Sequence, residues 1–332
     1  MNRISEVHRN SLFYRLIALW VVIEAFLGGI IHSFNLPISG LIVASGAVIC
    51  LSLIAQYCQV KGAILKATVI VALFKLMLSP QASPTAYIAV FFQGLLAQLL
   101  FTSNKYFSIK CIVLSVLALV QSGMQKIIVL TLLYGVDFYK AIDEMVGKLL
   151  HTKAHYSFSI YIAAAYVFIH LITGLVVGLF TASLPNKIIT WKAKYSLFTI
   201  DLNNTEEEVK KKKPRHKFIK AVLIVLFIIG LVYFTNTATG KSKILYLLVR
   251  AVSILFLWYF ILKPTFTFLL NKWLIKMKQK NMIIINTISN LIPDTISIVK
   301  QSWIYATHQS AENKVKLFAK LVIINIISND NY

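Results

Sequence analysis

Polar side chains interrupt two apolar helices predicted between residues 61 and 105, and this combination constrains the fold more than any other feature. The helices cover about Ala63–Leu78 and Thr85–Thr102. A membrane-spanning helix needs about 20 mostly apolar residues, or somewhat fewer when its flanks snorkel. A charge or amide in hydrocarbon costs a few kcal/mol, so such groups usually face a cavity or a partner helix. The polar residues inside these helices are Lys75, Gln93 and Gln98. The sequence therefore predicts an all-α polytopic membrane protein with a polar interior.

The composition favours the same class. Of the 332 residues, 58% are hydrophobic and 14% are charged, whereas a soluble domain carries about 25% charged residues. The 34 Lys and Arg against 12 Asp and Glu give a net charge of +22. In a membrane protein, basic residues gather in cytoplasmic loops and meet anionic lipid. Because no nucleic-acid-binding signature accompanies the charge, we expect a lipid bilayer and no nucleic acid as the partner of this surface.

Basic and neutral loops alternate along the first half of the chain, which predicts a six-helix bundle with a cytoplasmic N-terminus. Two further spans in it cover about Leu12–Ile31 and Ile38–Tyr57, and a sixth helix covers about Ser157–Ala182. That last helix holds Gly174 and Gly178, whose spacing permits close helix contact. The basic marks are Arg3, Arg9, Arg15, Lys61, Lys66, Lys105 and Lys110.

The fifth segment leaves two alternatives open. Apolar runs at Ile109–Val120 and Ile127–Val136 flank the polar stretch Gln121–Lys126. They form either one long, tilted helix with a polar interruption or a helix followed by a re-entrant element. Residues 137–153 then alternate apolar and charged side chains at helical spacing, which predicts an amphipathic helix on the outer interface.

A change in composition after residue 184 predicts a module boundary. Residues 185–217 are expected to form a basic cytoplasmic linker, followed by a transmembrane hairpin of about Phe218–Phe234 and Ile244–Leu262. No later run is expected to span the membrane, and residues 218–332 are expected to end in cytoplasmic amphipathic helices. Those helices cover about 266–278, 283–292, 295–308 and 314–327. The total is about eight transmembrane helices, with the bundle in residues 1–184 and both termini cytoplasmic.

Glu24 is the sharpest candidate for a functional residue. Apart from Glu6 it is the only acidic residue before Asp137, and it lies near the middle of the first helix. It is either a ligand or proton site facing the bundle, or a carboxyl that stays protonated or pairs with Lys75 for structural reasons. His32, eight residues on, falls on nearly the same face.

Four more polar residues inside apolar helices are candidates for a site. Lys75 either binds an anionic group of a ligand or snorkels to the headgroups. Gln93 and Gln98 are about 140° apart around their helix, and Gln93, with aromatic neighbours, is the better pocket candidate. His170 is either part of a site or the donor of an interhelical hydrogen bond.

No enzyme motif is present, so we expect no catalytic residue. The sequence holds no Gly-rich phosphate loop, HExxH or GxSxG. Cys50, Cys58 and Cys111 lie in apolar helices without a CxxC or Cys/His cluster, so they are expected to be core residues rather than zinc ligands. No metal or cofactor is expected, and ATP-driven transport would need an ATPase on another chain.

Several short stretches carry a resemblance to a known family. They are Leu36–Gly40 after the first helix, the turn Leu78–Pro84 leading into Val90–Gln98, and Met124–Phe138. With the six-helix arrangement, they make residues 1–182 resemble the substrate-binding (S) component of energy-coupling factor (ECF) vitamin transporters. The resemblance implies a ligand pocket that opens outward. By position, its candidate residues are Glu24, His32, Lys75, Gln93, Gln125 and Lys126.

The resemblance also implies partners. In that family, small residues on the first helix contact the transmembrane coupling (T) subunit, and here Ala18, Ala25 and Gly29 are available. The C-terminal part faintly resembles a T subunit, whose amphipathic helices hold ABC-type ATPases. The residues of that character are Pro293, Trp303 and Ala306, and the Ala-Arg-Gly motif expected there is absent.

These observations lead to one expected function and two alternatives. We expect a component of a bacterial inner (plasma) membrane transporter that binds a small vitamin-like or precursor molecule. Separate ATPase subunits would drive uptake, with or without a separate T subunit. One alternative is a membrane scaffold whose basic C-terminal region recruits a cytoplasmic partner or anionic lipid. The other is a proton-coupled secondary transporter that uses Glu24. An outward pocket lined by Glu24 and Gln93 would favour the first, and a solidly packed bundle the scaffold.

Overall fold

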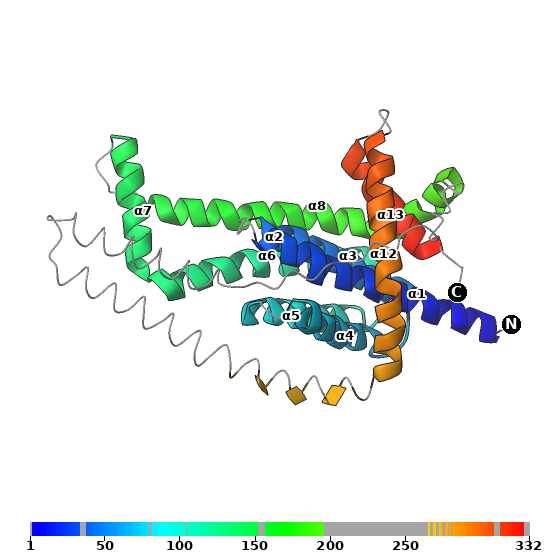
Figure 1. Ribbon diagram of the computed structural model, residues 1–332. Helices are drawn as coiled ribbons and strands as arrows, with labels where there is room; N and C mark the ends of the chain where they lie inside the picture. Colours follow the sequence, from blue (N-terminus) through cyan, green and yellow to red (C-terminus); the bar gives the residue numbers. More distant parts are fainter. Residues whose placement is uncertain are drawn as a thin grey trace.

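The computed structural model describes most of the two ends of the chain. The described residues are 2–33, 38–79, 82–103, 105–151, 157–195, 281–308 and 313–328, with scattered positions between 265 and 279. Every regular element in them is a helix (Figure 1). The predicted hairpin of residues 218–262 and the linker from residue 196 onward lie outside the described residues.

The first helix contains a π turn that the sequence analysis does not predict. Helix α1 (Asn2–Val21) continues directly into the π-helical turn η1 (Val22–Leu27) and then into α2 (Gly28–Ser33). The large side chains of Leu16, Ile17 and Trp20 are fully buried, so this helix forms the centre of the hydrophobic core. π turns are rare and are frequent at functional sites.

Three further helices follow close to their predicted ranges: α3 (Ser39–Tyr57), α4 (Ala63–Leu78) and α5 (Pro84–Leu100). Helices α3 and α4 pack on α1, whereas α5 packs on α4. Pro84 occupies the first helical position of α5, where its missing N–H costs nothing. Gly94 of α5 lies directly against the side chain of Thr68 in α4, and any side chain at Gly94 would overlap it. The absence of a side chain at this position therefore sets the close approach of α4 and α5.

The fifth segment is one uninterrupted helix, α6 (Phe107–Tyr134), so the first of the two alternatives describes it. Inside its polar stretch, the Gln121 side-chain amide donates to Gln125 Oε1 at 2.9 Å. This (i, i+4) bond leaves the helix intact because the two side chains partly satisfy each other. Helix α7 (Val136–Leu149) follows and stands across the far end of the bundle (Figure 1), as an amphipathic interfacial helix would.

Helix α8 (Phe158–Tyr195) is longer than predicted. It continues past residue 184 through Pro185, so the first eleven positions of the expected linker, 185–195, are helical. Proline removes a helical hydrogen bond. In the preceding turn, the hydroxyls of Thr181 and Ser183 donate to the carbonyls of Val177 and Phe180 at 2.7 Å each. The composition change after residue 184 therefore does not coincide with the end of a helix.

The C-terminal region differs from its prediction in one element. A single helix, α12 (Met282–His308), replaces the two predicted helices and contains Pro293 in its interior. It buries one stripe of residues, formed by Ile285, Ile288, Ile292, Thr295, Ile298, Ser302 and Ala306. Helix α12 packs on both α1 and α13 (Lys314–Ser328), and α13 also packs on α1 and α8. In Figure 1, α12 runs across the other long helices instead of alongside them.

Five helices in the described part of the chain are long and apolar enough to cross a membrane. They are the segments Asn10–Leu27, Ser39–Tyr57, Phe107–Leu132, Phe158–Tyr195 and Met282–His308. By length and composition, the expectation that nothing after residue 264 qualifies is thus wrong for α12. The outward side of α8 is strongly apolar, with Val176 60% and Leu179 59% exposed. In water such a surface would be costly, at about 25 cal/mol per Å².

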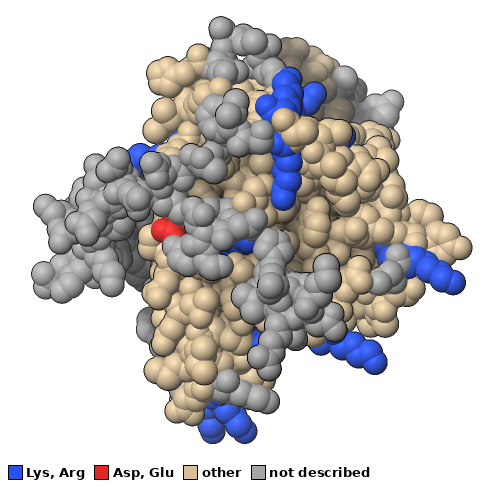
Figure 2. Space-filling model, turned by 90° about the vertical axis from the view of Figure 1, so that its right-hand side faces the viewer, with Lys and Arg blue, Asp and Glu red and all other residues tan. Residues whose placement is uncertain are grey.

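One end of the bundle collects the basic residues. We call it the basic end: it holds the N-terminus, the α3–α4 and α5–α6 connections, α12, α13 and the C-terminus (Figure 1). Figure 2 looks onto this end and shows Lys and Arg spread over its described surface, with little Asp or Glu. The opposite end carries α7 and the α4–α5 turn.

Candidate functional site

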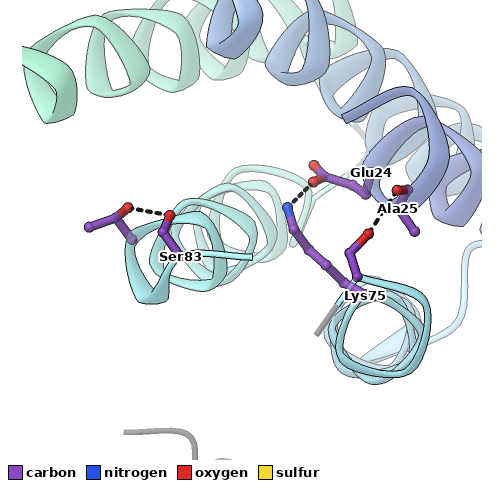
Figure 3. A network of polar contacts seen from close by, with 6 residues as sticks. Glu24, Ala25, Lys75 and Ser83 are labelled. Carbon is purple, nitrogen blue, oxygen red and sulfur yellow. Dashed lines mark hydrogen bonds and ion pairs between the residues drawn. The ribbon is translucent and has the colours of Figure 1, made fainter. Parts of the chain in front are cut away.

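A buried ion pair joins two of the predicted site residues, Glu24 and Lys75. Lys75 Nζ donates to Glu24 Oε2 at 2.6 Å, and the two side chains are only 5% and 3% exposed (Figure 3). Glu24 lies within the π turn η1, and Lys75 lies in the last turn of α4. Each charge is desolvated, so each depends on the other for compensation. Of the two interpretations of Glu24, the structure shows the pairing with Lys75.

A second contact fixes the same two helices. The Ser79 hydroxyl donates to the carbonyl oxygen of Ala25 at 2.9 Å, one residue beyond Glu24 (Figure 3). Gly29 lies opposite Ser79, because a Cβ on Gly29 would lie 3.3 Å from Ser79 Oγ. Ser79 was not singled out from the sequence, and its position one turn after Lys75 is the signal that could have identified it. The π turn and the end of α4 therefore form one connected polar unit.

Three buried polar atoms on α5 have no hydrogen-bond partner among the described residues. One is Gln98 Oε1, and the other two are the Tyr87 hydroxyl and Gln93 Oε1, on residues that are each 3% exposed. Gly94 lies opposite Thr68 in this antiparallel helix pair. Because the two helices are antiparallel, Tyr87, seven residues before Gly94, is level with Lys75, seven residues after Thr68. Buried polar atoms normally form hydrogen bonds, so each of these atoms marks a place where a further polar partner would be stabilising.

The remaining predicted pocket residues form a separate group on α6 and α8. His170 is 1% exposed, and its imidazole lies against Gly123, where a Cβ would lie 2.9 Å from the ring. Its Nδ1 is 2.9 Å from the carbonyl oxygen of Tyr166 in its own helix, so the structure does not show the interhelical hydrogen bond considered for it. Nε2 has no partner among the described residues. Gln125 and Lys126 are half-buried on α6.

The structure thus divides the predicted site residues into two groups instead of gathering them in one pocket. Glu24, Lys75 and Gln93 belong to η1, α4 and α5, whereas Gln125, Lys126 and His170 belong to α6 and α8. Helix α3 contacts both groups, and its Gly40 lies against Ser122 of α6. His32 falls in α2, and its side chain lies outside the described residues.

The predicted partner-contact residues also divide. Ala18 and Ala25 are 0% and 5% exposed, and Ala306 is fully buried, so these three are covered by the chain itself. Pro293 and Trp303 are exposed on α12, and Gly29 is half-buried. Of the six residues, only Pro293 and Trp303 are therefore exposed to a partner in this structure.

Two cavities at the basic end are lined by described residues. One, of about 220 Å³, lies between α1 and the α3–α4 connection. The other, of about 320 Å³, lies between the end of α3, the α5–α6 connection and α8. Neither is lined by Glu24, Lys75 or Gln93. Since the two side chains are 5% and 3% exposed, the ion pair is closed to solvent in this structure.

The fold and the site define an all-helical chain with candidate membrane spans and a charged pair buried among them. No protein-family model, curated protein or solved structure matches the chain. Among the described residues, no three His, Cys, Asp or Glu side chains are grouped as a metal site would require.

Proposed function

We propose that this chain is a membrane transport component whose N-terminal bundle binds a small, vitamin-like or precursor molecule, and that separate ABC-type ATPases drive uptake. The observation that carries the proposal is the buried Glu24–Lys75 pair within the apolar bundle. Ionisable groups at membrane depth are costly and usually serve a ligand, an ion or a proton. The unpartnered Tyr87 and Gln93 atoms extend this polar region onto α5.

The closed pair suggests how a ligand would be held. A ligand carboxylate could take the place of Glu24 at Lys75, while Glu24 would accept from an amine or hydroxyl of the same molecule. For this exchange, η1 must move away from α4. The π turn is a suitable place for such a movement, because its backbone already departs from the regular helical pattern. The resemblance to ECF S components is in agreement with a pocket on this side of the bundle.

The proposal places the basic end in the cytoplasm, in an inner (plasma) membrane with both termini inside. A cysteine at Ser83, in the exposed α4–α5 turn, is expected to react with a membrane-impermeant maleimide in intact cells. A cysteine at Ser103, in the exposed α5–α6 connection, is expected to react only after permeabilisation. The wild-type chain is the background, because Cys50, Cys58 and Cys111 are buried. The reverse labelling pattern would overturn the orientation.

Affinity purification tests the function itself. We expect the tagged full-length chain, extracted in mild detergent from its own cells, to carry an ABC-type ATPase pair that mass spectrometry identifies. Trp303 and Ile304, each 47% exposed on α12, offer an apolar contact at the basic end. Replacing Ile304 with Glu is expected to reduce ATPase recovery about tenfold, because a charge would be buried in the interface. Val315→Glu on α13, where Val315 is 66% exposed, is the matched control.

A scaffold is the second candidate, and one observation favours it. The Glu24–Lys75 pair is closed, and neither cavity lined by described residues reaches it. If no ATPase accompanies the full-length chain and another protein is lost on Ile304→Glu, the transport proposal fails and the scaffold is supported. ATPases retained equally by wild type and Ile304→Glu would keep the transporter but remove α12 as its coupling surface.

A further inference from the structure

The smaller cavity at the basic end combines positive charge with apolar walls. Its volume is about 220 Å³, and its lining comes from α1 and from the connection between α3 and α4. The lining residues are Asn10, Phe13, Tyr14, Cys58, Val60, Lys61, Gly62, Ala63 and Lys66. Ligand sites for drug-sized molecules measure about 300–1,000 Å³. This cavity is therefore of a size for a compact polar group and not for a whole substrate of that kind.

The cavity lies where the apolar spans end. The candidate span of α1 begins at Asn10, and that of α3 ends at Tyr57, immediately before Cys58. Both Asn10 and Cys58 line the cavity. In a bilayer this level corresponds to the boundary between hydrocarbon and headgroups. A group that enters the cavity from the membrane would thus arrive with its polar part at the level of the lysines.

The charges around the cavity are of one sign. Lys61 and Lys66 line it, and none of its lining residues is acidic. Helix α4 begins here at Ala63, so the positive end of its dipole adds to the field of the two lysines. Tyr14 and Asn10 supply a hydroxyl and an amide as uncharged donors. The larger cavity at the same end differs, because none of its lining residues carries a charge.

The backbone of the connection is held in a defined shape. The N–H of Val60 donates to the Cys58 carbonyl at 2.7 Å, and the N–H of Ala63 donates to the Val60 carbonyl at 3.0 Å. Gly62 has φ +77°, in the left-handed region that favours glycine. These bonds place Lys61 at the entrance of the cavity without the ordering of a long loop. Val60, beside it, is 52% exposed and provides an apolar edge next to the lysines.

We propose that this cavity binds the phosphate headgroup of an anionic phospholipid, with Lys61 and Lys66 pairing with the phosphate and Phe13 and Val60 contacting the start of the acyl region. The shared chemistry is a phosphate anion, and the apolar edge at the headgroup level assigns it to a lipid and not to free phosphate. The inference requires only that the bundle lies in a membrane. It is independent of which molecule the bundle transports and of any ATPase.

The test uses the full-length chain in mild detergent, titrated with phosphatidylglycerol and, in parallel, with phosphatidylcholine. Bound lipid is counted by native mass spectrometry, and thermal unfolding is followed by tryptophan fluorescence. We expect one tightly bound phosphatidylglycerol and an increase in Tm that phosphatidylcholine does not produce. Each basic residue near an anionic surface contributes about 1 kcal/mol, so Lys61→Gln/Lys66→Gln is expected to weaken binding roughly 30-fold. Lys61→Arg/Lys66→Arg is expected to retain it.

Lys314→Gln/Lys316→Gln is the matched control, because both lysines are exposed on α13 at the same end and the charge change is equal. Equal loss of binding in this control would show that the lipid responds to net charge alone, and unchanged binding in Lys61→Gln/Lys66→Gln would show that these lysines do not hold the lipid. Either result would overturn the proposal. Glycerol 3-phosphate and inorganic phosphate are added at millimolar concentration as competitors. If either raises Tm as much as the lipid does, the site takes free phosphate and the lipid assignment is wrong.

Discussion

Lys75→Met is expected to lower the free energy of unfolding by about 3–5 kcal/mol, because it leaves the Glu24 carboxylate buried without its partner. The two side chains are 5% and 3% exposed, and their 2.6 Å contact joins two buried charges. Methionine keeps most of the volume of lysine, so the loss reports charge and not a cavity. Denaturant titration in mixed micelles, followed by far-ultraviolet circular dichroism, measures it.

The double variant distinguishes the interaction between Glu24 and Lys75 from the separate contribution of each residue. Glu24→Gln alone is expected to be similarly destabilising, whereas Glu24→Gln/Lys75→Met is expected to return close to wild-type stability, because neither charge then remains. The exposed Lys140–Asp137 pair on α7 serves as the control, with side chains 69% and 49% exposed. Lys140→Met is expected to change stability by less than about 1 kcal/mol. If the loss of stability in the double variant equals the sum of the losses in the two single variants, Glu24 and Lys75 are not coupled.

A recovered double variant would also bear on function. Stability of the pair can be replaced by neutral side chains, but recognition of a charged ligand cannot. If Glu24→Gln/Lys75→Met folds normally and transports normally, the pair is a structural element and the proposed ligand site is elsewhere. If it folds normally and loses uptake, the charges serve the ligand. Stability and uptake thus need to be measured on the same variant.

The sequence predicts the helices of the bundle well because each is bounded by a clear signal. Pro84 begins α5, and the left-handed Gly62 precedes α4. The sequence also predicts the Glu24–Lys75 pairing as one of two alternatives, because these are two of the few charged residues inside apolar segments. The π turn at Val22–Leu27 could not be predicted, because it depends on the contacts that Lys75 and Ser79 make across 51 and 54 residues.

Other differences have equally local causes. Pro185 and Pro293 each suggest a helix end, yet α8 and α12 continue through them. Beside Pro185, Leu184 and Ile188 are buried in the core, and along α12 a buried stripe extends on both sides of Pro293. Tertiary packing thus overrides the helix-breaking tendency of proline. The division of the polar residues into two groups likewise depends on how α3 is placed between them, which no local pattern encodes.

The seam between α6 and α8 is expected to tolerate no side chain at Gly178. A Cβ there would lie 2.7 Å from the Cα of Ile112, and one at Gly174 would lie 2.9 Å from the Cα of Val116. Both neighbours are backbone atoms, so the helices themselves must separate. Gly178→Leu is therefore expected to destabilise the protein by about 3 kcal/mol, and Gly178→Ala by less. The same denaturant titration measures both.

Val176→Leu is the matched control, because Val176 is 60% exposed on the opposite side of the same helix. It is expected to leave stability unchanged. The effect of Gly178→Leu should also reach His170, which lies about two turns before Gly178 in α8. Its imidazole lies on Gly123 in the same seam. Without a strong hydrophobic force between helices in lipid, close backbone approach is a main source of association. If Gly178→Leu is as stable as wild type, α6 and α8 are held by other contacts and the GxxxG spacing is incidental.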